Sequence, residues 1–401
     1  MAIDVVRQIQ SFNAGRDPER LAMKYRAMRG SPFAFLRGSC HLFYDRLPRG
    51  GVLKSAPLVW VCGDLHLENF GSYKGDNRLV YFDVNDFDES ALAPASYDLV
   101  RFLTSLCVGA SSLSIGEAKA HLLCRIFLDA YATSLASGKA YWVERDTAQG
   151  LVRAMLDGLR NRQRASFLDL RTVIRRKQRL LRVDGKKALP VTGPQRAAIT
   201  NFMQAFAKSR AQPDFFAVLD VARRIAGTGS LGVSRYAILV QGKGSPDGNY
   251  LLDLKQAAPS SLLSHLKATQ PKWKSEAHRV VAVQRRMQAV SMAFLEPVFF
   301  DEGPYVLRAL QPSEDRMTAS GSRQSGSDLD HLVRTMGQLV AWAQLRSAGR
   351  DGSAIADELI EFGQRKKWRE QLLGASQDCA VQVRKDSTIF NAAWDDGAFS
   401  A

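Results

Sequence analysis

Two clusters of polar residues lie close together near residues 60–90, each flanked by apolar stretches. The first is Gly63-Asp64-Leu65-His66-Leu67-Glu68-Asn69, and the second is Asp83-Val84-Asn85-Asp86-Phe87-Asp88-Glu89. An aspartate such as Asp64 can accept a proton, and oxygens such as those of Asn69 and Asp86 are ligands that Mg²⁺ prefers. Carboxylates that cap two turns are the alternative, but two acidic clusters so close together are hard to explain by turns alone.

Two further residues near these clusters could assist such chemistry. His66 could orient the loop or contact a phosphate, and we count it with Asp64 as a catalytic candidate. The alternative is a neutral histidine that bonds to the backbone. Arg37, ahead of the first cluster, could contact a substrate or phosphate, or it could form an ion pair.

A glycine-rich segment, Gly227-Thr228-Gly229-Ser230-Leu231-Gly232, follows much later in the chain. Its spacing fits a dinucleotide-binding turn, which opens a helix, or a kinase-type loop, which lies between strands. Residues 233–240 are β-branched and aromatic, and after a turn at 242–248 the chain returns as an apolar stretch that ends in Lys255. We therefore expect a hairpin that follows the glycine-rich loop. Gly227, Gly229, Ser230 and Gly232 of that loop are expected to bind phosphates together with Lys255. A glycine-rich turn with a solvated lysine is the alternative.

These segments together hold the parts of a phosphoryl-transfer site. Asp64 is the expected base, Asn69 and Asp86 are the expected ligands of Mg²⁺, and the glycine-rich loop and Lys255 are expected to bind ATP. The order of the parts differs from that of an ordinary kinase.

The first cluster resembles the GDxHxxN catalytic loop of aminoglycoside phosphotransferases and related protein-kinase-like enzymes. Residues 85–99 resemble the metal-binding strand and helix start that follow in those enzymes. In that register Asp86 falls on the metal-binding aspartate, with Asp83 and Asp88 as alternatives. The glycine-rich lobe precedes the catalytic loop in those enzymes but follows it here, so the resemblance implies a circular permutation.

The permuted order, with SPFAFLRGS, CGDLHLENFG, YFDVNDFDE and the QRRMQ stretch, resembles the bacterial family called domain of unknown function 2252 over nearly the whole chain. The resemblance implies a nucleotide site more than a defined reaction. It also implies that a helix glutamate accompanies the phosphate lysine, for which Glu276 has plausible spacing and Gln284 lies two turns deeper. Gln256, in place of an acidic residue, and the stretch 291–294 depart from the family pattern.

The elements that position these residues form an expected α+β, bilobal, protein-kinase-like fold. Residues 1–60 are an N-terminal helical segment packed on the large lobe, and 61–212 are the large lobe, with short strands around the catalytic loop and a helical block from 97 to 212. Residues 213–312 are the small nucleotide-binding lobe with a hinge near 305–312, and 313–401 return to the helical large lobe. We expect a flexible loop at 319–327, and we expect the end of a helix over 328–347 to lie beside the strand that carries Val61.

Composition excludes several classes of protein. The 401 residues are 46% hydrophobic and 24% charged, which is typical of a globular protein with a sizeable core and not of a disordered or coiled-coil chain. Five scattered cysteines without a CxxC pair, no apolar leader and no apolar run long enough to span a bilayer lead us to expect a reduced, cytoplasmic protein.

The net charge of +15 is concentrated in one segment. Twelve Lys and Arg residues stand against three Asp residues between Arg153 and Lys187, whereas residues 63–98 are acidic. A solvated helix face is one explanation, and a surface for an anionic acceptor is another; nucleic acid is possible but not favoured.

Three functions compete on this evidence. The first is an ATP- and Mg²⁺-dependent phosphotransferase with an unknown, hydroxyl-bearing, possibly anionic acceptor. The second is a kinase-like protein that transfers a nucleotidyl group, or that binds nucleotide and an acidic partner or nucleic acid without catalysis. A metallophosphoesterase is disfavoured because the further aspartate and histidine motifs of a two-metal centre are missing.

Overall fold

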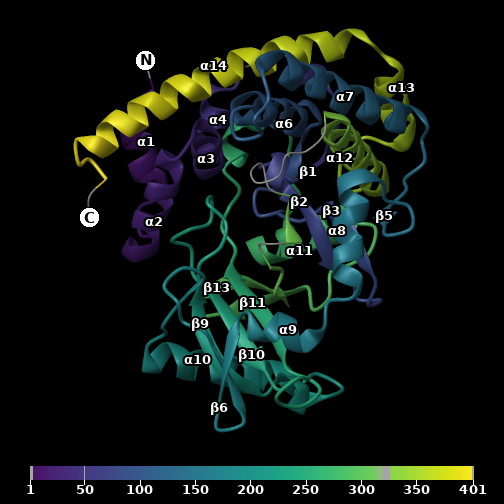
Figure 1. Ribbon diagram of the computed structural model, residues 1–401. Coiled ribbons are helices and arrows are strands. Elements are labelled where there is room, and N and C mark those ends of the chain that lie inside the picture. The colour runs from purple at the N-terminus through teal and green to yellow at the C-terminus, as the bar shows by residue number, and fades with distance from the viewer. Residues whose placement is uncertain (1–2, 49, 313–314, 318–325, 400–401) are drawn as a thin grey trace.

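The computed structural model describes residues 3–48, 50–312, 315–317 and 326–399, and it has an α+β architecture. Figure 1 shows a helical body, crossed by the long helix α14 (Lys367–Asp395), above a large antiparallel sheet. Helix α1 (Val5–Phe12) contacts α14, and Gln10 donates a hydrogen bond of 2.9 Å to the carbonyl of Ala398. The described ends of the chain therefore lie side by side.

The helical body surrounds two small sheets. Its helices are α1, α2 (Pro18–Arg29), α3 (Pro32–Gly38), α4 (Cys40–Arg46), α5 (Val52–Ser55), α6 (Ser96–Gly109), α7 (Glu117–Ala136), α8 (Gly150–Arg160), α12 (Gly326–Ser347), α13 (Ala356–Gln364) and α14. Its strands are β1 (Leu58–Val61), β2 (Phe70–Lys74), β3 (Val80–Val84), β4 (Ala91–Pro94) and β5 (Val143–Glu144), in the sheets β1-β4 and β2-β3-β5. The buried apolar core runs through α6, whose residues from Leu99 to Val108 are almost all buried.

The large sheet has the strand order β12-β13-β11-β10-β9-β8 among the described residues. Its strands are β8 (Ala188–Leu189), β9 (Val218–Arg224), β10 (Arg235–Val240), β11 (Tyr250–Gln256), β12 (Glu296–Phe300) and β13 (Gly303–Ala309). Helices α10 (Gly193–Ala207) and α11 (Glu276–Met287) accompany it, as do the short turns η2 (Pro213–Phe216) and η3 (Leu263–His265). The predicted hairpin is confirmed, because β10 pairs antiparallel with β11. The glycine-rich segment lies between β9 and β10, ahead of this hairpin, and Lys255 lies near the end of β11.

The expected position of the helix over 328–347 is also confirmed. Trp60 donates from its indole Nε1 to the carbonyl of Arg350, just beyond α12, at 3.1 Å, and the amide of Ala354 donates to the carbonyl of Leu58 at 2.7 Å. The end of α12 therefore lies beside β1. The loop predicted over 319–327 falls outside the described residues up to residue 325, and α12 begins at Gly326.

The prediction of continuous helix from 97 to 212 is wrong for the most basic part of the chain. Beyond α9 (Arg164–Asp169), β6 (Thr172–Arg175) and β7 (Gln178–Leu181) pair as a hairpin. Their turn residues, Arg176 and Lys177, have φ of 49° and 67°, the left-handed region that matches the twist of a tight hairpin. The pairs Thr172–Leu181 and Val173–Leu180 at the open end of the hairpin, together with this turn, outweigh the helix propensity of the arginines.

The sheet also begins earlier in the chain than the predicted division at residue 213. Strand β8 pairs with β9, and α10 packs against β9 and η2 through Ile199 and Met203. The elements around the large sheet therefore start at Ala188.

Two expectations from composition can be compared with the structure. All five cysteines are buried free thiols. No helix within the described ranges is long and apolar enough to cross a membrane.

A buried ionic cluster joins the central strands of the large sheet. Asp253 on β11 is fully buried and accepts a two-pronged contact from Arg235, at 2.8 and 2.6 Å. Arg224 and Arg308 approach the same carboxylate at 2.8 and 3.5 Å. Burial disfavours the charge of Asp253, but the arginines outweigh it and hold its pKa well below the usual range.

We predict that Asp253→Asn destabilises the fold by about 3–5 kcal/mol, because buried guanidinium groups would lose their counter-charge. Urea unfolding measures the change in free energy. Asp76→Asn, at an exposed carboxylate, serves as the control. Equal stability of the two variants would contradict the role given to the cluster.

Candidate active site

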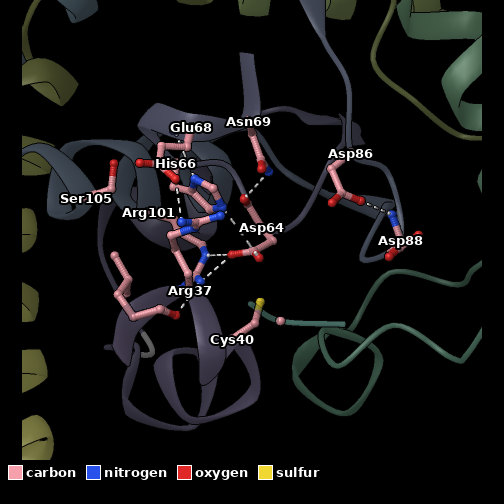
Figure 2. A network of polar contacts seen from close by, with 12 residues as sticks. Arg37, Cys40, Asp64, His66, Glu68, Asn69, Asp86, Asp88, Arg101 and Ser105 are labelled. Carbon is pink, nitrogen blue, oxygen red and sulfur yellow. Dashed lines mark hydrogen bonds and ion pairs between the residues drawn. The ribbon is translucent and has the colours of Figure 1, made fainter. Parts of the chain in front are cut away.

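A cavity of about 380 Å³ lies between the large sheet and the helical body. It brings together nine of the predicted site residues, which come from three distant parts of the chain: Asp64, His66, Asn69, Asp86, Gly227, Gly229, Ser230, Gly232 and Lys255. Glu276 does not line it. Figure 2 shows Asp64 at the centre of this network, with Asn69 and Asp86 on one side and Arg37 and Arg101 on the other.

Asp64 is held by a fully buried arginine that sequence reasoning missed. Arg101 on α6 contacts Asp64 Oδ1 through Nε, at 2.7 Å, and through a second guanidinium nitrogen that also donates to the carbonyl of Leu36 at 2.9 Å. The guanidinium lies 4.8 Å from the ring centre of Phe43. Burial raises the pKa of Asp64 to about 6 although Arg101 opposes the shift, so the carboxylate is ionised at neutral pH and still able to take a proton.

The loop that carries Asp64 is anchored from the start of α6. Asp98 accepts hydrogen bonds of 2.9 Å from the backbone amides of both Cys62 and Gly63. Gly63 has a φ of +84°, and a Cβ there would lie 2.1 Å from the carbonyl oxygen of Glu89. This position therefore requires glycine, because the two polar clusters touch at this point.

His66 is buried as a neutral side chain. Its Nδ1 accepts a hydrogen bond of 3.1 Å from the amide of Glu68, so the ring proton lies on Nε2, which is 4.0 Å from Asp64 Oδ2. Burial lowers the pKa of His66 well below its usual value, and Arg37 and Arg101 shift it the same way. The contacts match those of a histidine that shapes the loop and faces Asp64.

Asn69 and Asp86 present a donor set that fits Mg²⁺. Asn69 donates from Nδ2 to the carbonyl of Asp64 at 2.5 Å, which leaves its Oδ1 as an acceptor on the cavity side. Burial disfavours the charge of Asp86, but Lys255 and Arg316 outweigh it and lower its pKa to about 2. One carboxylate and one amide oxygen, completed by phosphate and water, form a usual magnesium environment.

The alternatives to Asp86 are separated by the structure. Asp83 is buried in β3, lies 3.4 Å from Arg346 of α12, and does not line the cavity. Asp88 lines the cavity but forms an ion pair with Lys255. Asp86 is therefore the aspartate of this cluster best placed to hold a metal.

Glu276 does not accompany Lys255. Its carboxylate contacts Arg279, one helical turn along α11, at 2.6 Å. Arg279 in turn donates to the carbonyls of Asp88 and Ser90. Since Asp88 is already the partner of Lys255, α11 supports the lysine indirectly, through Arg279 and the backbone around Asp88.

The glycine-rich loop lies close to the loop that carries Asp64. A Cβ on Gly229 would lie 3.9 Å from Asp64 Oδ2 and 3.0 Å from the carbonyl oxygen of Arg37, so the close approach favours glycine. Arg16 and the fully buried Lys24 both donate to the carbonyl of Gly229, at 2.9 and 3.0 Å. The N-terminal helices therefore position this loop as well as packing on the helical body.

Two more arginines line the cavity. Arg37, which the sequence left between two roles, forms an ion pair with Glu68 and also lines the cavity. Sequence reasoning missed Arg316. Its backbone pairs with Gly71 of β2 in an isolated β-bridge, and its positive charge attracts the carboxylate of Asp86. The Nε atoms of both arginines are buried without a hydrogen-bond partner, so each retains a donor.

Equal numbers of carboxylates and of Lys or Arg side chains line the cavity, and the neutral His66 is counted with neither. The carboxylates are Asp64, Asp86, Asp88 and Glu89, and the cations are Arg16, Arg37, Lys255 and Arg316. A polyphosphate that enters such a balanced site meets repulsion from the carboxylates, which a divalent cation would relieve. The charge balance thus agrees with the donor set of Asn69 and Asp86.

Comparison with protein families gives a match over residues 16–393. The family is described as an uncharacterized protein conserved in bacteria (DUF2252). The chain belongs to this family. A search of curated proteins and a search of solved structures each found no match for this DUF2252 chain.

In this DUF2252 protein we predict that Arg101→Met is destabilising, and more so at about pH 8 than at about pH 5. At the higher pH the variant leaves a buried, ionised Asp64 without its partner, a loss of about 3–5 kcal/mol. At the lower pH Asp64, with its pKa of about 6, is mostly protonated in both proteins, and the difference shrinks. Urea unfolding at both pH values measures this difference.

Arg125→Met is the matched control, because the Arg125–Glu370 pair is exposed on both sides. It should leave the free energy of unfolding nearly unchanged at either pH. A loss from Arg101→Met that is the same at both pH values would show that the arginine acts through packing alone.

Proposed function

We propose that this protein is an ATP- and Mg²⁺-dependent phosphotransferase with a circularly permuted, protein-kinase-like fold. The observation that carries the proposal is the single cavity that unites Asp64, Asn69, Asp86, the glycine-rich loop and Lys255. Geometry of this kind supplies the main needs of phosphoryl transfer, which are positioning and charge stabilisation.

The order of the strands supports the kinase-like part of this proposal. The glycine-rich loop joins β9 to β10, the lysine follows on the adjacent strand β11, and α11 comes next before β12 and β13. A loop, a lysine on the third strand and a helix in this order are typical of the nucleotide-binding lobe of kinases. Here the catalytic loop precedes them in the chain, which is the expected permutation.

Each residue has a defined role in this proposal. Asp64, oriented by Arg101, accepts the proton of the acceptor hydroxyl. The backbone of the glycine-rich loop and the ammonium of Lys255 hold the phosphates, with Arg37 and Arg316 as further donors beside them. Mg²⁺, when bound by Asn69 and Asp86, would neutralise charge that develops on the phosphate oxygens.

The position of the basic segment bears on the chemical class of the acceptor. The basic segment 153–187 lies beyond the cavity, and parts of it are already neutralised, since Arg179 contacts both Asp169 and Asp247. An anionic, hydroxyl-bearing small molecule remains the acceptor that we propose, ahead of nucleic acid.

We predict that Asp64→Asn lowers the rate of ATP turnover by about 10²–10⁴-fold and leaves nucleotide binding intact, because a base is lost while the loop keeps its shape. Lys255→Ala should weaken nucleotide binding about tenfold through the loss of a charge-assisted contact. Turnover is measured with Mg²⁺ by the mass of the intact products, and binding by thermal shift.

Lys208→Ala, at an exposed lysine that directly follows the end of α10, is the control for Lys255→Ala. Undiminished turnover in Asp64→Asn would remove Asp64 from the role of base. Pyrophosphate among the products would identify nucleotidyl transfer, and a nucleotide-dependent thermal shift without any turnover would identify a binding protein.

A further inference from the structure

A second cavity, of about 480 Å³, lies where the chain crosses from the large sheet to the helical body. Its walls come from the β2–β3 hairpin, α8 and α9, the start of β11, and residues 309–312, several of which are labelled in Figure 1. No described residue lines both this cavity and the catalytic cavity. It is therefore a separate site.

The rim of this cavity is rich in cations. Lys74, Arg78, Arg162 and Arg164 line it, whereas its carboxylates are Asp76 and Asp315. Asp315 is buried, and both of its oxygens are held by Arg162 at 2.7 Å. The remaining cations thus face the cavity with little compensation.

Lys74 is the clearest of these uncompensated charges. Among the described residues, its ammonium has no hydrogen-bond or ion-pair partner. Burial lowers its pKa, and Arg164 and Arg78 lower it further by repulsion. Like charges gathered in one place are destabilising unless an anion joins them.

The floor of the cavity is apolar and one wall is already ordered. Leu159, Leu251, Met292 and Leu310 contribute aliphatic surface. Arg164 lies 3.8 Å from the ring centre of Tyr250 and donates to its hydroxyl at 2.8 Å. A guanidinium fixed in this way loses little freedom when it contacts a ligand.

We propose that this cavity binds a small organic anion, with an aromatic or aliphatic part on the floor and a phosphate or carboxylate group facing Lys74, Arg78 and Arg164. The volume is that of a pocket for one small molecule, and the combination of an apolar floor with a few placed charges is typical of such pockets. The site goes beyond the proposed transfer reaction and does not depend on it.

A small molecule fits this site better than nucleic acid does. Nucleic acid requires a basic surface that continues along the backbone. Here the neighbouring basic residues Arg153 and Arg179 are already held by carboxylates, Arg153 by Asp157 and Arg179 by Asp169 and Asp247. Lys74, Arg78 and Arg164, by contrast, line the cavity itself without a carboxylate partner among the described residues.

The fluorescent aromatic sulfonate 8-anilinonaphthalene-1-sulfonate tests the proposal on the full-length protein, since it combines an apolar ring system with one negative charge. We expect saturable binding that Lys74→Glu weakens about tenfold. Ala293→Phe, which fills the cavity, should also weaken it. Lys208→Glu makes the same charge change at an exposed site and should bind as the wild type does, as should Lys255→Ala in the catalytic cavity.

Displacement then identifies the anionic group. Phenyl phosphate and benzoate are compared as competitors with neutral benzyl alcohol, and stronger displacement by either anion supports the proposal. Wild-type affinity in both Lys74→Glu and Ala293→Phe overturns it, and since Lys74 is exposed, its variant remains a test even where Ala293→Phe fails to fold. Equal displacement by benzyl alcohol, or displacement by single-stranded DNA that Lys74→Glu abolishes, also overturns it.

Discussion

The contact between Arg101 and Asp64 is the interaction on which the cavity around Asp64 depends. Arg101 is fully buried on α6, and it joins the carboxylate to the carbonyl of Leu36 on α3 and to the ring of Phe43 on α4. Without this counter-charge the pKa of the partly enclosed aspartate would rise further. The arginine keeps it ionised near neutral pH and fixes its direction, so the same contact sets both the chemistry of the loop and the packing of three helices around it.

Most charged side chains near this contact form ion pairs, both within the large sheet and at the cavity. Within the large sheet, Asp253 compensates the arginines of β9, β10 and β13. At the cavity, Lys255 pairs with Asp88, which leaves Asp86 ionised and available beside Asn69. Because most charges already have protein partners, the cavity is poised for a ligand that brings its own cation together with its negative charge.

Much of this site could be predicted from local sequence, and the rest could not, for physical reasons. Short motifs, recognisable from residue spacing alone, contain Asp64, Asn69, Asp86 and the glycine-rich loop. Arg101 and Arg316 stand in no motif, because their roles arise from packing between distant segments. Glu276 was predicted from the family resemblance and its distance along the chain from Lys255, but the local contact with Arg279 determines the position of its carboxylate. The basic hairpin was missed because its few apolar residues stand among many basic ones, and because its turn residues, Arg176 and Lys177, are not the Asn or Gly that usually mark a tight hairpin.

The hydrogen bonds between the N-terminal helices and the glycine-rich loop have a consequence for how the protein folds during synthesis. The hydrogen bond from Lys24 Nζ to the carbonyl of Gly229 joins residues 205 positions apart, and the backbone amide of Asp17 donates to the carbonyl of Gly232. During synthesis the N-terminal helices leave the ribosome long before the glycine-rich loop is made. Their contacts with that loop can form only after the intervening chain has been synthesised. Contacts of such long range slow folding, since the loop has to close before they stabilise anything. The contacts between the N-terminal helices and the glycine-rich loop are therefore expected to form late in folding, and chains that end before Gly229 lack them.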